Sequence, residues 1–221
     1  MSTTTRKPAA VRREEIVQAV LRIIGERGLT SLTTSNLAAE VELTTGALFR
    51  HFASHEEILR EATRHAVARI EATFPDESLA PLDRLLALAR NRVRVLGADP
   101  GLAWFLRSEQ ASLALPQDAA NLLRDLVTRS KTYLLATLRE GIADGSIRDD
   151  IDPQILLVPV LGTVHTLIGM SGVQRTSPGR RPSSDRVLAG LVALLSPPEP
   201  GSVGTKRKTA KPKRKPKHPR R

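Results

Sequence analysis

The chain has 221 residues, enough for one large domain or two modest domains with a substantial core. It contains no cysteine, which excludes disulfides, thiolate nucleophiles and zinc–thiolate sites. The net charge is +11, but ten of the 34 Lys and Arg residues lie in 201–221, so residues 1–200 hold 24 basic against 23 acidic residues and are nearly neutral.

The first helical pattern begins after a short polar arm. Residues 1–11 are small and polar, contain no apolar stretch typical of a signal peptide, and are expected to be disordered. From Arg12 onward, apolar residues such as Ile16 and Val20 recur at helical spacing, and Gly28 predicts the end of this helix.

Two short helices follow in quick succession. One is predicted over 34–41, and the next over 44–52, where the sequence reads TTGALFRHF. Only Glu42 and Leu43 separate them. Two helices joined by so tight a turn indicate a helix-turn-helix.

The helix over 44–52 has an inward side and an outward side. At about 100° per residue, Leu48 and Phe52 fall together and must face the preceding helices, whereas Gly46 and Arg50 lie opposite. Gly46 costs the helix about 1 kcal/mol relative to Ala, a cost that a close approach to a partner would justify. The major groove of DNA, about 12 Å wide, admits one such helix. The pattern favours a DNA-reading helix, and the alternative is an ordinary helical corner with a solvated face.

Polar groups around this helix suit contacts with a duplex. Thr44 and Thr45 can bond to base edges or phosphates, and Arg50 can read guanine or neutralise a phosphate. Ser54 and the free N–H groups of the next helix offer a phosphate site. Basic residues near the N-terminus can reach phosphates beside the groove, namely Arg6, Lys7, Arg12 and Arg13.

The rest of the chain reads as helices. Ser54 and Glu57 have the spacing of a capping box, which predicts a helix from there to about Pro75. Further helices are predicted over 79–96, 101–111, 117–143, 153–172 and 184–195. No stretch alternates with the period of a strand, so the predicted fold class is all-α. The segment 199–221 is rich in Lys, Arg and Pro and is expected to be a disordered basic tail.

Residues 155–173 contain no Lys, Arg, Asp or Glu and are just long enough to cross a bilayer. They also contain Pro159, Gly162 and His165, and no second stretch of this kind exists. A helix buried on all sides by protein is therefore favoured over a membrane span. We expect a cytoplasmic protein that is associated with the nucleoid when bound to DNA.

Two stretches carry a family resemblance. REEIVQAVLRIIGERGLTSLTTSNLAAEV, followed by TTGALFRHFASHEEIL, resembles the DNA-binding domain of the TetR/AcrR family of bacterial transcriptional regulators over residues 12–58. Further on, REGIADGSIRDDIDPQILL resembles a phrase from the C-terminal domains of that family. The resemblance implies an N-terminal three-helix helix-turn-helix DNA-binding domain, over 12–53, and a C-terminal helical ligand-binding and dimerisation domain, over 54–198. It also implies a homodimeric repressor that binds a palindromic operator and is released by a small-molecule inducer.

The resemblance assigns roles to single residues. Thr44, Thr45 and Gly46 match positions that contact DNA, as does Phe49, and His51 matches a position that contacts the DNA backbone. The family usually has Tyr in place of Phe49 and Lys in place of His55, so this chain lacks one hydroxyl and one permanent charge, which the basic tail would offset. The expected DNA-binding residues are Thr34, Thr44, Thr45, Gly46, Phe49, Arg50, His51 and His55.

In the C-terminal half, the rarer large or polar side chains are the candidates for ligand binding. These are Trp104, Phe105, Tyr133, His165 and Met170, and each is alternatively a packed core residue. Helices 153–172 and 184–195 are the expected dimer interface, because the first is apolar nearly all round. Small residues such as Gly162 and Gly190 would let the backbones of two copies approach.

A second hypothesis is a DNA-organising or protein-partnered factor that uses the basic tail and senses no ligand. An enzyme is disfavoured, because the sequence has no His/Asp/Ser set at a telling spacing, no phosphate loop and no metal cluster. His51 and His55 are spaced to share a metal but lack an obvious third ligand. No cofactor is expected.

Overall fold

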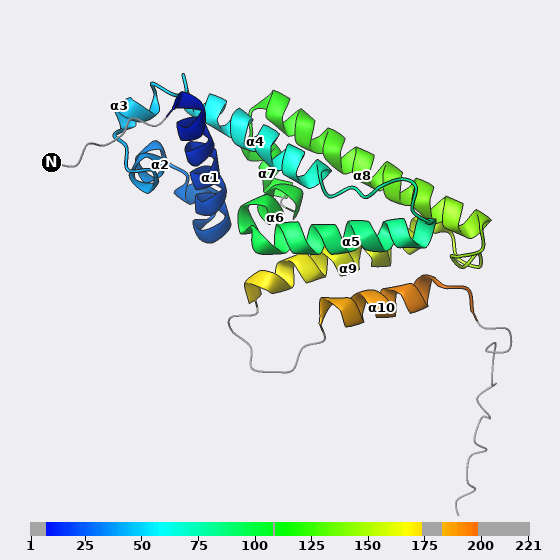
Figure 1. Ribbon diagram of the computed structural model, residues 1–221. Coiled ribbons are helices and arrows are strands. Elements are labelled where there is room, and N and C mark those ends of the chain that lie inside the picture. The colour runs from blue at the N-terminus through cyan, green and yellow to red at the C-terminus, as the bar shows by residue number, and fades with distance from the viewer. Residues whose placement is uncertain (1–7, 108, 174–182, 199–221) are drawn as a thin grey trace, which may run out of the picture.

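The computed structural model describes residues 8–107, 109–173 and 183–198, and within them the regular structure is helical (Figure 1). In chain order the elements are α1 (Ala9–Arg27), the 3₁₀ turn η1 (Leu29–Ser31), α2 (Thr34–Glu40), α3 (Thr45–Leu48), α4 (His55–Glu71), α5 (Pro81–Ala98), α6 (Pro100–Arg107), α7 (Glu109–Ala114), α8 (Gln117–Ala143), α9 (Pro153–Val173) and α10 (Ser184–Leu195). The predicted all-α class is confirmed. The predicted arm and tail lie largely outside the described residues.

Some helix boundaries differ by a few residues from the expected ones, as for α5, which covers Pro81–Ala98 instead of 79–96, and three further differences are described here. Helix α1 begins at Ala9, three residues earlier than Arg12, after an N-cap at Pro8. The helix expected over 101–111 is two helices, α6 and α7. The third difference concerns α3, which ends at Leu48 instead of extending to 52.

Helix α3 is short because its backbone tightens after Leu48. The N–H of Arg50 donates to the carbonyl of Ala47, and the N–H of His51 donates to that of Leu48. These bonds span three residues, as in a 3₁₀ turn, so the regular α-helix stops there. Phe52 still donates to the carbonyl of Leu48, which keeps both side chains on the inward side as predicted.

The helices form a small unit at one end of an elongated body. In Figure 1, α1, α2 and α3 lie together, and α4 leads from them along α8. Helix α5 packs between α8 and α9, and α10 lies against α9 on the outside. Helices α1 and α6 form the most extensive contact between the two regions. One continuous set of buried apolar side chains runs through both.

Helix α9 is the charge-free helix of the sequence, and it is buried on one side only. Leu156, Val160 and Val164 are buried, whereas Ile155 and Val158 are 62% and 68% exposed. The expectation of a helix buried on all sides is therefore wrong for the single chain. Among the described residues, no helix combines the length and the apolar character that a bilayer crossing requires.

Candidate nucleic-acid interface

Threonine side chains cap both helices of the helix-turn-helix. The hydroxyl of Thr33 accepts a hydrogen bond from the N–H of Asn36 at the start of α2, at 3.1 Å. The hydroxyl of Thr44 accepts one from the N–H of Ala47 at the start of α3, also at 3.1 Å. Such caps each stabilise a helix by about 1 kcal/mol. The Thr44 hydroxyl hydrogen stays available to donate to a phosphate.

The turn between α2 and α3 is built without glycine. Glu42 adopts a left-handed backbone, with φ 54°. Its N–H donates to the carbonyl of Ala39, and the N–H of Leu43 donates to that of Ala38. These two bonds form a Schellman motif, a helix end that usually has glycine at the left-handed position. The motif sets the angle at which α3 leaves α2.

Buried side chains and one arginine fix α3 from behind. Leu48 and Phe52 are fully buried against the other helices. The guanidinium of Arg13 lies 4.0 Å from the centre of the Phe52 ring and donates to the carbonyl of His51. It also pairs with Glu57 at 3.1 Å. Arg13 therefore joins α1 to the end of the α3 turn and to α4.

Glu57 completes the start of α4 as the sequence predicted. The hydroxyl of Ser54 accepts from the N–H of Glu57 at 3.1 Å, and the Glu57 carboxylate accepts from the N–H of Ala53 at 2.6 Å. That bond and the neighbouring Arg13 hold the pKa of the Glu57 carboxyl below its ordinary value. The predicted bond to Ser54 is therefore formed, but the return bond to Glu57 comes from Ala53 instead of Ser54, and the two bonds together fix where the helix after α3 begins.

The surface that remains open on α3 holds most of the predicted contact residues. Thr44, Thr45, Gly46 and Arg50 are exposed, and Phe49 is 40% exposed. A Cβ added at Gly46 would meet nothing within 4 Å. Within the described part of the chain, Arg50 has no hydrogen-bond or ion-pair partner, so its donors face solvent. Thr34, His51 and His55 are partly buried around this surface.

Two of the basic residues expected near phosphates are engaged inside the protein. Arg13 is held as described above, and Arg12 donates to the carbonyl of Val41 at 3.3 Å and pairs with Glu15 at 2.9 Å. The expectation that both reach toward phosphates is therefore wrong for these conformations. The sequence showed that this arm is basic. It did not show that α1 begins early enough to direct the side chains of both Arg12 and Arg13 toward the protein.

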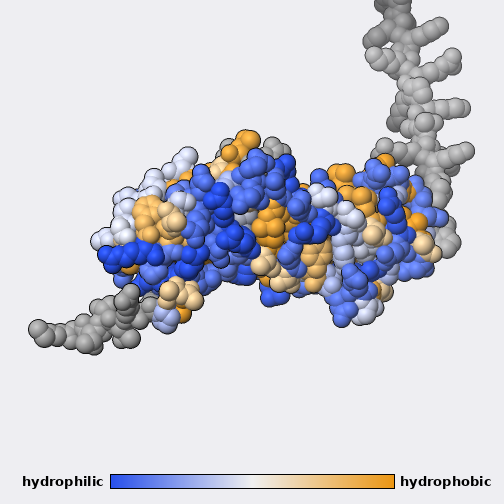
Figure 2. All heavy atoms as spheres, turned by 90° about the horizontal axis from the view of Figure 1, so that it is seen from above, coloured by the Kyte–Doolittle hydropathy of each residue, from blue (hydrophilic) through white to orange (hydrophobic). Residues whose placement is uncertain are grey.

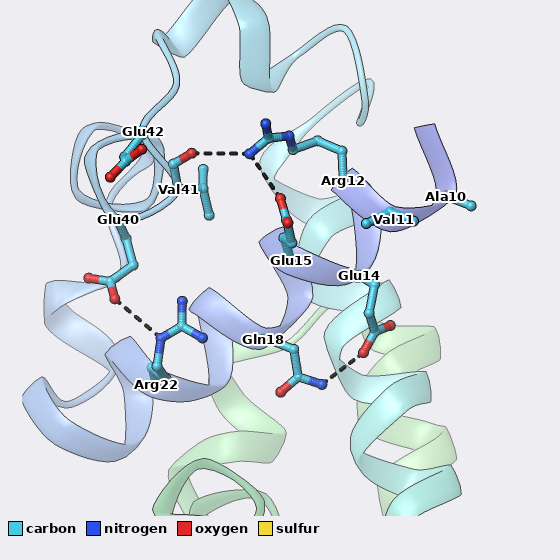
Figure 3. A pocket seen from close by; sticks show the side chains of 10 residues that line it. All are labelled: Ala10, Val11, Arg12, Glu14, Glu15, Gln18, Arg22, Glu40, Val41 and Glu42. Atoms are coloured by element: carbon cyan, nitrogen blue, oxygen red, sulfur yellow. Dashed lines mark hydrogen bonds and ion pairs between the residues drawn. The ribbon is translucent and has the colours of Figure 1, made fainter. Parts of the chain in front are cut away.

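A wide groove beside the turn has the opposite character to α3. It encloses about 690 Å³ between α1 and the end of α2, and Figure 3 shows Arg12 and Arg22 reaching across it to Val41 and Glu40. Four glutamates line it, namely Glu14, Glu15, Glu40 and Glu42. Because only Arg12 and Arg22 offset these four carboxylates in the lining, the groove is net negative and would repel phosphates. The open face of α3 is therefore the better surface for DNA.

The candidate ligand residues of the C-terminal half do not form one site. Trp104 lines a cavity of about 330 Å³ between α1, α5, α6 and α9. Phe105 stacks edge-on against Trp104, with ring centres 5.2 Å apart, but is buried in the core. His165 and Tyr133 are not among the cavity-lining residues, and the side chain of Met170 lies outside the described part of the structure.

Tyr133 lies in a separate cluster. Its ring packs edge-on against Phe74, with centres 5.0 Å apart, and its buried hydroxyl has no hydrogen-bond partner in the described structure. Burial raises the pKa of this hydroxyl. The residues of the cavity that sequence reasoning missed include Arg107 and Gly169. A lone arginine and a helical glycine gave no sequence signal, because only the tertiary fold brings them together.

The described residues hold no group of three or more His, Cys, Asp or Glu side chains arranged for a metal ion. His51 and His55 flank the α3 surface instead. The fold and the surface define an all-helical protein with an N-terminal helix-turn-helix and a larger C-terminal helical domain. This is the architecture of helix-turn-helix DNA-binding proteins that carry a second helical domain.

Comparisons with known proteins agree with this class. Residues 16–62 match the family model described as bacterial regulatory proteins, tetR family. The transcriptional repressor KstR2 of Mycolicibacterium smegmatis is 27% identical over 168 residues, 71% of this chain and 77% of that protein. The nucleoid occlusion factor SlmA of Vibrio cholerae is 29% identical over 159 residues, 70% of this chain and 80% of that protein.

A solved structure shows the same fold. AibR, in complex with isovaleryl coenzyme A and operator DNA, has a TM-score of 0.70 and 19% identity, and the match covers 85% of this chain and 99% of AibR. The N-terminal part of the chain therefore matches the DNA-binding region of the tetR family of bacterial regulatory proteins, and the fold of AibR extends over most of the chain.

Proposed function

We propose that this regulator is a homodimeric repressor that binds a palindromic operator through α3 and is released by a small-molecule inducer. The observation that carries the proposal is the open, glycine-bearing face of α3, fixed from behind by Leu48, Phe52 and Arg13. A fixed helix with small residues in front can enter the major groove, where Thr45 and Arg50 meet bases and phosphates.

The proposed DNA contacts divide by their chemistry. Arg50 supplies a charged fork for a guanine edge or a phosphate, and Gly46 lets the backbone approach closely. We propose that Thr44 and His51 contact phosphates, with Thr34 and His55 at the edges of the same surface. Phe49 contributes apolar contact in place of a hydroxyl. We further propose that the DNA-binding domain spans residues 12–53 and that the C-terminal domain spans residues 54–198.

The exposed faces of α9 and α10 support a dimer. On α9, Ile155, Val158 and Gly162 point outward, and on α10 Gly190 and Leu194 do so. This face carries apolar and small residues, whereas Figure 2 shows the side of α4 and α8 to be mostly hydrophilic with separate hydrophobic patches. Pairing α9 and α10 of two copies would make a four-helix bundle. It would set two α3 helices about 34 Å apart, as a palindrome requires.

Release by an inducer would be a population shift. The domains meet mainly where α1 packs on α6, so a ligand near that contact can favour one position of α3 relative to its copy. The ligand can shift this equilibrium only to the extent that its affinities for the two forms differ. AibR, which has the same fold, is known with both isovaleryl coenzyme A and operator DNA.

The test begins with a site selected from random duplexes by the full-length protein. Arg50→Ala and Gly46→Glu are each expected to abolish the footprint on that site, because one removes a contact of about 1–3 kcal/mol per copy and the other blocks the groove approach. Both variants should stay dimeric in sedimentation. Arg94→Ala, which removes an exposed charge on α5, is the matched control and should bind normally. A normal footprint with Gly46→Glu contradicts the proposed docking.

A second candidate function is favoured by the similarity to SlmA, whose name describes a nucleoid occlusion factor. In that role the basic tail would hold DNA without sequence preference. Each phosphate that the tail neutralises adds about 0.9 to the log–log salt slope of binding. Deleting residues 201–221 should flatten this slope and keep sequence preference if the protein is an operator-specific repressor. Loss of preference with the tail would favour the second function.

A further inference from the structure

The cavity beside Trp104 lies where the two domains meet. Ile24 and Gly25 of α1 form one wall, and Trp104 and Arg107 of α6 form another. Gly169 of α9 and a turn of α5 close the remaining sides. Its volume of about 330 Å³ is at the lower end of the range for small-molecule sites, roughly 300–1,000 Å³. Anything bound there touches both the DNA-binding domain and the C-terminal domain.

Arg107 supplies the charge of this cavity. Its guanidinium rests against the backbone of Gly169, where an added Cβ would lie 2.5 Å from Nη1. Within the described residues it forms no hydrogen bond or ion pair, and none of the lining residues is acidic. Because Arg107 is exposed, it lies at the rim of the cavity. Its five N–H donors are available to a bound anion.

Two further basic side chains lie one helical turn from the cavity. His165 precedes Gly169 by four residues on α9, and Arg92 precedes Leu96 by four on α5. Arg92 is 3% exposed and donates to the hydroxyl of Ser130 at 2.7 Å. Burial lowers the pKa of Arg92 to about 10, so it stays charged at neutral pH. The pKa of His165 is lowered by its burial and then by Arg107 and Arg92.

The acidic groups in this region are placed elsewhere. Asp99 accepts a hydrogen bond from the N–H of Leu102 at 3.1 Å. Asp99 and Glu26 line a neighbouring groove, which shares Gly25 and Pro100 with the cavity. No carboxylate in the described structure pairs with Arg92 or Arg107. The cavity therefore has a net positive environment.

The remaining walls of the cavity are apolar. Ile24, Leu96 and Ile168 line it, together with the half-buried ring of Trp104. Trp104 is held in place by its edge-on contact with Phe105. A ligand that fills this space therefore needs an apolar body as well as a negative group, because burying polar atoms against these walls without partners is costly.

We propose that this cavity is the effector site and that it binds a small organic monoanion, whose carboxylate pairs with Arg107 and whose apolar body packs on Trp104. The inference rests on the proposed ligand-responsive function and names the site and the chemical class of its ligand. The cavity adjoins the crossing of α1 and α6, where an added Cβ on Gly25 would be 2.5 Å from the N atom of Gly101. A ligand bound beside this crossing would directly affect the position of α1.

Trp104 is the single tryptophan of the chain, so its fluorescence reports on the cavity. The full-length protein is titrated with octanoate and phenylacetate, and with their neutral isosteres octanamide and phenylacetamide. At least one carboxylate should give a saturable change and bind about tenfold more tightly than its amide, as expected for a charge-assisted contact at a partly solvated arginine. Equal binding of acid and amide, or no saturable change with either acid, overturns the inference.

Three variants locate the charge. Arg107→Gln should remove the preference for the carboxylate, and Arg94→Gln, the matched loss of an exposed charge on α5, should keep it. Gly169→Ala keeps every charge but displaces the Arg107 guanidinium, so it should weaken carboxylate binding more than amide binding. A preference that survives Arg107→Gln places the anion elsewhere and overturns the assignment.

Binding to the selected duplex, measured with and without the carboxylate, separates this inference from the proposed function. DNA binding without any carboxylate site defeats the inference alone. Carboxylate binding that depends on Arg107, in a protein that binds no duplex, leaves the site standing and defeats the repressor proposal. Release of DNA by the carboxylate, lost in Arg107→Gln, supports both.

Discussion

At the scale of single residues, the helix-turn-helix depends on a strained position. Glu42 has left-handed φ at the end of α2, where a side chain with a Cβ is disfavoured by about 1–2 kcal/mol. The two backbone bonds of the Schellman motif hold it there. The strain is tolerated because the chain must turn from the end of α2 at Glu40 to the start of α3 at Thr45 within four residues.

Glu42→Gly should relieve this strain and raise the free energy of unfolding by about 1 kcal/mol, less the extra freedom of glycine in the unfolded chain. Urea denaturation followed by circular dichroism measures it. Glu42→Ala removes the same charge but keeps the strain, so it should bring no comparable gain. An equal gain from both substitutions would mean that charge, not backbone strain, is relieved.

Glu57 makes the stability of the fold depend on pH. Its folded pKa is lowered, chiefly by the N–H of Ala53 and then by Arg13, from an ordinary value of 4.5. The unfolded chain therefore binds more protons as pH falls below that value, and the contribution of Glu57 to stability is lost as pH falls through the folded pKa. Above pH 4.5 the contribution is fully present.

Glu57→Gln should therefore lower stability at neutral pH and flatten the decline of stability on acidification below about pH 4.5. Denaturation midpoints measured from pH 7 down to acid check the shape. Glu56→Gln removes a neighbouring carboxylate that is 67% exposed and is the control, with little change expected. If the stability of the wild type and of Glu57→Gln declined in parallel with pH, protonation of the Glu57 carboxylate would not be coupled to folding.

At the scale of elements, the contact between α1 and α6 depends on two glycines. A Cβ at Gly101 would lie 2.3 Å from the carbonyl oxygen of Leu21, and one at Gly25 would meet the backbone at Pro100 and Gly101. Both clashes involve backbone atoms, which cannot rotate away. The two helices therefore cross with their backbones nearly touching.

Gly101→Ala should lower the free energy of unfolding by about 1–3 kcal/mol, the usual effect of overpacking. Gly46→Ala is the matched control: its Cβ meets nothing, and alanine favours a helix, so stability should stay equal or rise. Thermal and urea unfolding of the two variants side by side measure the difference. A Gly101→Ala protein as stable as the wild type would show that α6 shifts freely against α1.

At the scale of the whole molecule, the face on which α9 and α10 expose apolar and small residues is the surface that a second copy would cover. Val158 of α9 is 68% exposed and lies one turn from Gly162 on the same helix. A carboxylate placed there would be desolvated in the dimer without a partner, which opposes association strongly.

Val158→Glu should therefore give a monomer in sedimentation and lose cooperative operator binding, while its helical content is unchanged. Leu113→Glu is the control, since Leu113 is 86% exposed on α7, away from this face, and should leave the oligomeric state alone. A dimeric Val158→Glu protein would move the interface to another surface.

Features that depend on neighbours in the chain could be predicted from the sequence, whereas features that depend on tertiary contacts could not. Periodicity and capping predicted α8 and α10 with the observed bounds, and Leu48 and Phe52 as buried anchors, because these depend on neighbours in the chain. The short α3 and the inward Arg13 depend on tertiary contacts and escaped prediction. The same holds for the cavity, since Arg107 and Gly169 are 62 positions apart and meet only after folding.

The glycine crossing also sets a rule for exchanging parts between such regulators. An N-terminal unit taken from this chain would seat on a foreign sensing domain only if that domain offers glycine at the place of Gly101, because any side chain there would strike the Leu21 carbonyl. Hybrid regulators built from this scaffold should therefore be chosen first by that one matching position, before charge or loop length is considered.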